Sequence, residues 1–380
     1  MKYIKYLKVN IAIIIITMLF ATKLSFALDV VADKAILIDY DTSEVVFEKN
    51  SQEQTYPSSM AKLMTAYVIF DMLENKELSL GDKFVIAEKA WREEGSRMFL
   101  KWGSAVSIDE LLHGLIIQSG NDSATALAEG SSEGYEGFVI RMNETAKKLD
   151  LKGSSFSNSV GWSDDKTYMT VEDIAILSQR IIKDFPKYYK KYYSQKEYTY
   201  NNIRQYNRNW LLTEFEGTDG LKTGYTPEGG YGMAVSAVRD GRRLIAVVNG
   251  LNSKRERVEE AKKLLRYGFD TCDRIELFKF DEIGKAKVWM GKKDEVNLVA
   301  KDSIFITVEK RYVKDIESKI EYGEYVKAPI KKGDVIAKLI VKAPKGREVS
   351  YDLYANEDVR RLGFFGRIWF WIVSFVKGIF

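Results

Sequence analysis

Residues 57–73 read PSSMAKLMTAYVIFDML, in which a serine, a lysine three positions later and a long apolar stretch follow one another. From Met60 through Leu73 the residues are apolar almost all round a helix, which predicts a helix buried in a core. Ser59 then lies one helical turn before Lys62, on the same face and at the positive end of the helix dipole. Because lysine rarely tolerates burial, the pair indicates a nucleophile with its base.

Lys62 can act as a base only while its amine is neutral. Burial and a second nearby cation both lower the pKa of a lysine, and Lys222 is a candidate for that cation. The Ser-x-x-Lys pattern by itself is weak, because Ser163 and Lys166 match it too. That second copy lies in a polar loop, and we interpret it as a coincidence.

Ser119-Gly120-Asn121 forms the second short segment of interest. It follows a predicted helix that opens with a capping box of Ser107 and Glu110, and another helix is expected from about Ser123. A short polar link between two packed helices can project one hydroxyl and one amide into a cleft. Ser119 could then relay a proton and Asn121 could bind a substrate amide. Standing alone, the segment would be an ordinary helix–helix turn.

Lys222-Thr223-Gly224 is the third segment, and it precedes a predicted hairpin, residues 231–238 and 243–249, turned at Asp240-Gly241. The glycine allows an extended peptide to pair closely with the strand, while the lysine and the hydroxyl can hold a carboxylate. An exposed lysine that guards an edge strand against aggregation is the ordinary alternative. The order of all three segments favours acyl transfer without histidine.

The chain contains one histidine, His113. It falls off the apolar stripe two residues from Leu111, and no neighbour reads as a partner for a Ser-His-Asp arrangement. We therefore expect a solvated or partly packed side chain, and a serine enzyme here would need lysine as its base. This chemistry calls for no metal and no cofactor.

Composition describes an ordinary globular protein of 380 residues, 46% hydrophobic and 29% charged. The net charge of +4 comes from Lys2, Lys5, Lys8 and Lys23, in an N-terminal stretch without acidic residues. Without that stretch the net charge is zero, so overall charge gives no reason to expect a nucleic-acid partner.

The first 27 residues are typical of a secretory signal peptide, with an apolar run from Ile11 to Phe20 and small residues before a cut ahead of Leu28. A retained N-terminal anchor is the alternative. Cys272 is the only cysteine and cannot form an internal disulfide, so we expect a buried bystander.

The pattern of the remaining chain changes near Cys272. We predict a mixed α/β domain over residues 28–272, which carries the three segments and includes strands at 34–39 and 44–49, and a small all-β domain over 273–353. Residues 354–380 contain a Phe-, Trp- and Ile-rich stretch with its polar residues along one helical face. This pattern favours a helix lying in the plane of a membrane surface, and a helix packed on its own domain is the alternative.

The three segments resemble the motifs of the low-molecular-mass penicillin-binding proteins of the D-alanyl-D-alanine carboxypeptidase family. The resemblance extends from about Val31 to Phe380. It includes five further stretches: Pro57-Ser58-Ser59, Gln118 to Ala128, Asn207-Arg208-Asn209, Thr218-Asp219-Gly220-Leu221 and Leu264 to Phe269. Two positions depart from the family: Ser58 replaces a usual alanine, and Tyr168 follows Thr167 where a His-containing stretch is common.

This resemblance implies an α+β fold like that of β-lactamases, a helix-flanked antiparallel sheet, followed by a small all-β domain and a C-terminal amphipathic helix. It makes Ser59 the acylated nucleophile, Lys62 its base, and Ser119 and Asn121 the groups for proton transfer and substrate binding. Carboxylate binding falls to Lys222 and Thr223 of the third motif and to Arg257, and Gly224 and Tyr225 are further substrate-binding residues. The backbone N–H groups of Ser59 and Tyr225 would form the oxyanion hole.

The function implied is removal of the terminal D-alanine from peptidoglycan pentapeptide stems, at the outer face of the cytoplasmic membrane, with β-lactam antibiotics as inhibitors. A β-lactamase is one alternative, although no Glu-x-x-Leu-Asn segment occurs between Asn121 and Lys222. A catalytically silent wall-binding sensor is another, and the intact pair of Ser59 and Lys62 argues against it.

Overall fold

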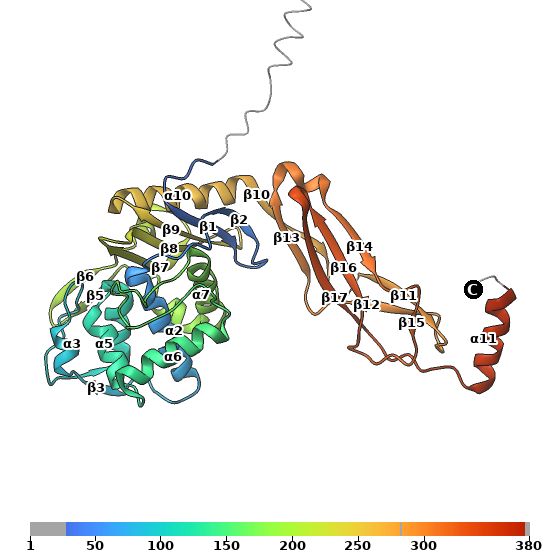
Figure 1. Cartoon of the computed structure of the whole chain (residues 1–380), viewed down its shortest axis with the longest axis horizontal. Coiled ribbons are helices and arrows are strands. Elements are labelled where there is room, and N and C mark those ends of the chain that lie inside the picture. The colour runs from blue at the N-terminus through green and yellow to red at the C-terminus, as the bar shows by residue number, and fades with distance from the viewer. Residues whose placement is uncertain (1–27, 282, 377–380) are drawn as a thin grey trace, which may run out of the picture. The chain divides into compact units, whose positions relative to one another are not determined.

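The computed structural model describes residues 28–281 and 283–376. The predicted signal peptide, residues 1–27, lies outside the described residues. The chain is built from a mixed α/β part, which carries all three sequence motifs, and an all-β part that follows it in sequence (Figure 1).

A five-stranded antiparallel sheet forms the centre of the α/β part, in the order β2-β1-β9-β8-β7. Its strands are β1 (Lys34–Asp39), β2 (Val45–Lys49), β7 (Thr218–Thr226), β8 (Gly230–Arg239) and β9 (Arg242–Leu251). The strands and the hairpin expected from alternating apolar residues are thus present. Strand β7, which contains Lys222-Thr223-Gly224, lies at an edge and leaves one side open for a peptide.

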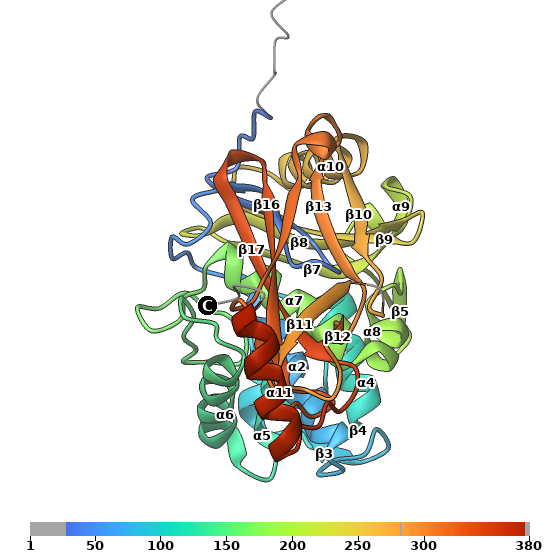
Figure 2. The ribbon, with the colours of Figure 1, turned by 90° about the vertical axis from the view of Figure 1, so that its right-hand side faces the viewer.

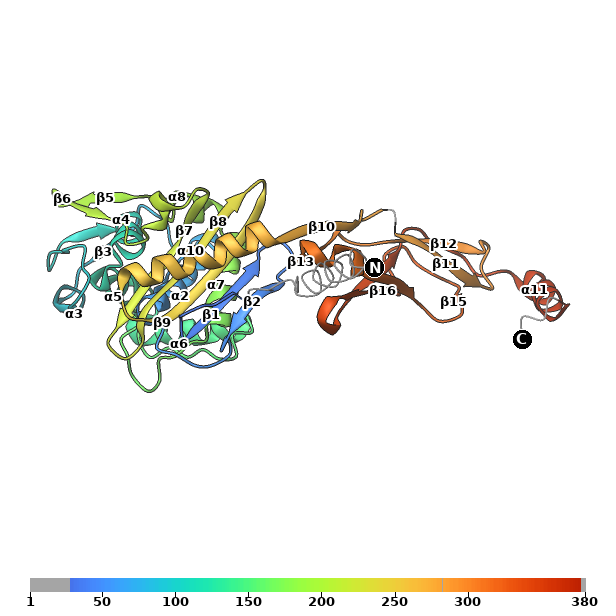
Figure 3. The ribbon, with the colours of Figure 1, turned by 90° about the horizontal axis from the view of Figure 1, so that it is seen from above.

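Helices cover both faces of this sheet. Helix α10 (Lys254–Thr271) lies along one face and α7 (Val171–Asp184) packs on the other (Figures 1 and 3). The other helices and short strands of this part are α2 (Lys62–Glu74), α3 (Glu88–Arg92), α4 (Ile108–His113), α5 (Asn121–Gly130), α6 (Gly134–Lys148), α8 (Pro186–Tyr192), α9 (Leu211–Glu214), β3 (Lys83–Val85), β4 (Ala105–Ser107), β5 (Glu197–Tyr200) and β6 (Ile203–Tyr206).

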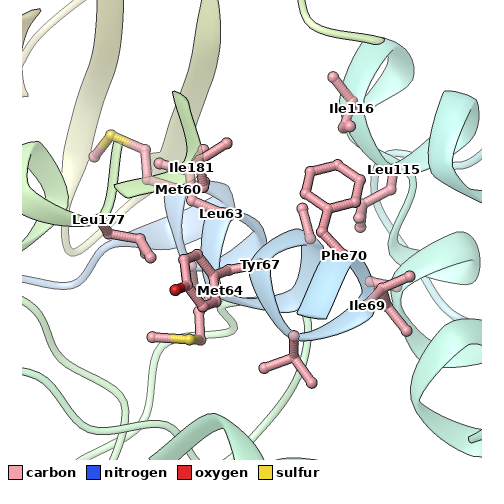
Figure 4. Close-up of a cluster of buried hydrophobic side chains, with 14 of the residues drawn as sticks. Met60, Leu63, Met64, Tyr67, Ile69, Phe70, Leu115, Ile116, Leu177 and Ile181 are labelled. Carbon is pink, nitrogen blue, oxygen red and sulfur yellow. The ribbon is translucent and has the colours of Figure 1, made fainter. Parts of the chain in front are cut away.

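Helix α2 runs through the core, as its apolar sequence predicts. All its residues except Asp71 and Glu74 are buried. Its side chains point to two sides, where Phe70 approaches Leu115 of one neighbouring segment and Leu63 approaches Ile181 of α7 (Figure 4). The α-helix begins at Lys62, two residues later than expected, because Ser58–Ala61 form a 3-10 turn. Ser59 therefore lies in that turn, directly before the helix.

The predicted capping box at Ser107 is present, since its hydroxyl accepts from the N–H of Glu110 and the Glu110 carboxylate accepts in return. Helix α4 then continues as a π-helical turn, Gly114–Gln118, and ends at Ser119 with a left-handed φ of 63°. His113 is buried rather than solvated, because its ring stacks on Tyr198 with centroids 4.4 Å apart. Its aromatic packing explains why it does not follow the apolar stripe of α4.

The all-β part begins at β10 (Cys272–Phe278), which pairs with β13 (Ile304–Glu309). A six-stranded sheet has the order β14-β16-β17-β12-β11-β15, in which β16 and β17 form the longest ladder (Figure 2). Its strands are β11 (Gly284–Trp289), β12 (Glu295–Val299), β14 (Glu317–Glu321), β15 (Val326–Lys327), β16 (Val335–Ala343) and β17 (Arg347–Ala355), with 3-10 turns at Lys310–Asp315 and Pro344–Gly346. A separate apolar core fills this part.

Helix α11 (Phe364–Val376) follows the sheets. The four residues after Val376 lie outside the described residues. Several of its apolar side chains are strongly exposed, including Phe365 at 83% and Trp369 at 69%. Within residues 28–281 and 283–376, no helix has both the length and the apolar character needed to cross a bilayer.

Candidate active site

Ser59 and Lys62 meet as their spacing predicts. The Lys62 amine lies 3.0 Å from the Ser59 hydroxyl, and it also donates to the side-chain oxygen of Asn121 at 2.8 Å and to the carbonyl of Val160 at 2.8 Å. The lysine side chain is only 1% exposed. A buried amine held by three oxygen atoms has one fixed position, and that position is beside the nucleophile.

Burial lowers the pKa of Lys62 to about 7. The negative charges of Glu93 and Asp122 oppose this shift, and the nearby cation Arg208 adds to it. Lys222 was the cation expected, and the two lysines do repel each other, because the charge of Lys62 lowers the pKa of Lys222. Arg208 is a further cation that the sequence did not suggest. The reason is that Arg208 comes from a distant loop whose position the sequence does not reveal. A pKa near neutrality suits a general base.

Lys222 is buried too, and its amine donates to the hydroxyl of Ser119 at 2.6 Å and to the carbonyl of Thr223 at 3.0 Å. An edge-guarding lysine would be exposed, so that alternative fails. Burial, followed by the charges of Lys62, Arg208 and Arg257, holds the pKa of Lys222 well below its usual value. Ser119 thus links the second motif to the third through the Lys222 amine.

Gly224 permits a close approach of another part of this chain. A Cβ atom at this position would lie 2.9 Å from the carbonyl oxygen of Pro57 and 3.1 Å from the Cβ of Ser58. The missing side chain therefore lets β7 pack against the turn that carries Ser59. The strand also continues past the glycine to Thr226, and the Arg257 guanidinium donates to the Gly224 carbonyl at 3.1 Å.

A cleft of about 660 Å³ opens over these groups. It is lined by seven of the predicted site residues: Ser59, Ser119, Asn121, Thr223, Gly224, Tyr225 and Arg257. Lys62 and Lys222 are hydrogen-bonded to two of these, Ser59 and Ser119. Every residue predicted for the site is therefore in one place. Arg208 and Trp162 also line the cleft and were not singled out for the site. For Arg208 the Asn207-Arg208-Asn209 stretch was the available signal.

The second Ser-x-x-Lys copy has a different environment. Ser163 lies in a loop, and its hydroxyl donates to the hydroxyl of Thr226 at 3.1 Å. The backbone N–H of Lys166 bonds to the Asp164 carboxylate. This geometry agrees with the interpretation that the second copy is a coincidence.

Comparison with known proteins decides the family. The D-alanyl-D-alanine carboxypeptidase family matches residues 21–253, and the C-terminal domain of penicillin-binding protein 5 matches residues 274–361. The carboxypeptidase DacA of Haemophilus influenzae is 36% identical over 92% of this chain and 91% of its own length. The chain belongs to the D-alanyl-D-alanine carboxypeptidase family. The predicted family and fold class are thereby confirmed.

Other members show the same relationship. DacF of Bacillus subtilis is 34% identical over 88% of this chain and 87% of its own length. The crystal structure of penicillin-binding protein 5 from H. influenzae superposes with a TM-score of 0.82 at 34% identity, covering 88% of this chain and 98% of that one. Penicillin-binding protein D2 of Listeria monocytogenes in its ampicillin-bound form covers 64% of this chain and 99% of its own, with a TM-score of 0.59 at 27% identity.

Proposed function

We propose that this chain removes the terminal D-alanine from peptidoglycan pentapeptide stems through an acyl-enzyme on Ser59. The observation that carries the proposal is the 3.0 Å contact between the Ser59 hydroxyl and the buried Lys62 amine, whose pKa is about 7. Close to half of such amines are neutral at pH 7, and a neutral amine can accept the hydroxyl proton. Penicillin would acylate the same serine.

The first half of the reaction uses both amines. Ser59 Oγ attacks the carbonyl carbon of the penultimate D-alanine while Lys62 takes its proton, and the N–H groups of Ser59 and Tyr225 stabilise the oxyanion. The carbon–nitrogen bond then breaks, and the departing amine receives a proton through Ser119, which accepts from Lys222 at 2.6 Å. In the second half water attacks the ester, and one of its protons passes through Ser119 to the deprotonated Lys222. Lys62 returns its proton to Ser59 Oγ as the ester bond breaks, which restores the hydroxyl and both amines.

The substrate carboxylate would lie at the cationic end of the cleft. This region is lined by Thr223, Arg208 and Arg257, and the Lys222 amine donates to the carbonyl of Thr223. Burial lowers the pKa of Arg257 to about 10, and repulsion from the neighbouring charge of Arg208 adds to this shift. An incoming carboxylate would relieve that repulsion.

Converting the terminal carboxylate of the peptide to an amide is expected to lower kcat/KM by about one to two orders of magnitude, because a charge-assisted hydrogen bond contributes about 1.5 to 3 kcal/mol. Thr223→Val removes a hydroxyl with little change of shape and should reduce this discrimination. The measurement is kcat/KM for the acid and amide forms of one peptide with both enzymes. Equal cleavage of the two forms by the wild type would place the carboxylate elsewhere.

We propose the following organisation for the whole chain: a signal peptide at residues 1–27, the peptidase domain at 28–272, the all-β domain at 273–353 and a membrane-surface anchor at 354–380. The exposed aromatic side chains of α11 support the anchor, since Trp369 and Trp371 suit a membrane interface. In this arrangement the enzyme is exported and works at the outer face of the cytoplasmic membrane.

Deletion of residues 362–380 is expected to move the protein from the membrane fraction to the soluble fraction while peptide hydrolysis stays intact. The tail carries the exposed apolar surface, whereas all the proposed catalytic groups lie in residues 59–257. Fractionation followed by a D-alanine release assay measures both properties. Retention in the membrane after the deletion would point instead to an uncleaved N-terminal segment.

A further inference from the structure

Trp162 is a large aromatic side chain of the cleft wall to which the proposed chemistry assigns no task; Tyr206, Trp210 and Tyr231 are others. It lines the cleft and is 43% exposed. Its loop is rigidly built, because the Asn158 side-chain oxygen accepts from the N–H groups of Val160, Gly161 and Trp162 at 3.2, 2.7 and 3.1 Å. The same loop supplies the Val160 carbonyl that holds Lys62. The indole is therefore fixed relative to the base.

Glu93 fixes the orientation of the ring. The indole N–H donates to one carboxylate oxygen of Glu93 at 3.3 Å, and the other oxygen accepts from the Thr125 hydroxyl at 2.7 Å. The Cζ2–Cη2 edge of the ring, next to the indole N–H, faces Gly95. A Cβ atom there would lie 3.3 Å from Cη2 of Trp162 and 3.0 Å from the amide nitrogen of Asn121. Only a glycine thus separates the indole from the predicted substrate-binding amide.

This placement defines which part of a substrate the indole would meet. The proposed function puts the terminal carboxylate near Lys222 and Thr223 and the carbonyl of the penultimate D-alanine at Ser59. We therefore assign the next amide along the stem, that of the residue before the two D-alanines, to Asn121, which shares the Lys62 amine with Ser59. The side chain of that preceding residue then extends past Asn121 toward Trp162. The face of an indole is a suitable surface for the methylene groups of a long aliphatic side chain.

We propose that Trp162 is a specificity-determining residue that receives the aliphatic side chain of the stem residue before the D-alanyl-D-alanine pair, and that Glu93 is its positioning residue. The inference rests on the proposed function. It adds a substrate preference that the catalytic groups alone do not explain, since they contact only the backbone and the two D-alanines.

The test compares two peptides with the purified full-length protein: Nα,Nε-diacetyl-L-lysyl-D-alanyl-D-alanine and N-acetyl-glycyl-D-alanyl-D-alanine. We expect the wild type to favour the lysyl peptide about tenfold in kcat/KM, as burial of a few methylene groups permits. Trp162→Ala should remove most of this preference while kcat/KM for the glycyl peptide stays within about twofold. Trp162→Phe should keep most of the preference, and Glu93→Ala should weaken it.

Trp102→Ala is the matched control, because Trp102 is 62% exposed but stacks on Trp91 instead of lining the cleft. It should leave the preference unchanged. Equal kcat/KM for the two peptides in the wild type, or an equal fall for both in Trp162→Ala, would overturn the inference. These outcomes still leave D-alanine release intact, whereas a wild type that hydrolyses neither peptide would refute the proposed function itself.

Discussion

Replacing Ser59 with alanine is expected to abolish both D-alanine release and covalent labelling by penicillin. No other hydroxyl contacts the amine of Lys62 among the bonds described, so the variant has no substitute nucleophile. Loss of a nucleophile that works with a base lowers kcat by about four orders of magnitude or more. Labelled penicillin followed by mass spectrometry of the modified peptide measures the effect directly.

Ser163→Ala provides the control within the same chain, because it disrupts the second Ser-x-x-Lys copy. The Ser163 hydroxyl bonds to Thr226, and its removal should leave labelling and hydrolysis close to wild type. If Ser59→Ala still forms the adduct, the assignment of the nucleophile is wrong. If Ser163→Ala loses it, the loop serine has a part in catalysis that the geometry does not suggest.

Local features of the fold and site could be predicted because local sequence determines them. The distance between Ser59 and Lys62 follows from a spacing of three residues at the start of a helix, and burial of the lysine follows from the apolar residues around it. The capping box at Ser107 is equally local. The 3-10 turn at Ser58–Ala61 was missed because close packing against Gly224, from a distant strand, shapes it.

Contacts between distant segments could not be predicted in the same way. The sequence suggested that Ser119 and Lys222 share a site but not that they bond to each other, and it gave no reason to place Arg208 beside Lys62. Burial of His113 depends on Tyr198 from a separate hairpin. The resemblance to a known family predicted that these residues share one site. Which of them bond to each other depends on how distant segments pack in the folded chain.

The pH dependence of the enzyme tests the base. Because the pKa of Lys62 is about 7 and only its neutral amine can accept a proton, kcat/KM should rise as the pH passes through about 7. Below that value the amine is protonated, so activity should fall about tenfold for each pH unit. Lys62→Met removes the base and keeps an unbranched side chain in the buried site. It should lower kcat and penicillin acylation by about 10²- to 10⁴-fold above pH 7, and the variant should lack the fall in activity that the wild type shows below pH 7.

Lys262→Met is the matched control, since Lys262 of α10 is also buried but is paired with Glu214 of α9 and Glu259 of α10. It should leave unchanged the acidic limb of the pH profile, which is the fall of kcat/KM below about pH 7. An acidic limb near pH 4 in the wild type would indicate a carboxylate base, because an unperturbed carboxyl titrates at about that pH. Lys62→Met with undiminished acylation would likewise remove the lysine from the mechanism. Neither result would contradict the assignment of Ser59. The penicillin adduct identifies the nucleophile, whereas the pH dependence of kcat/KM identifies the base.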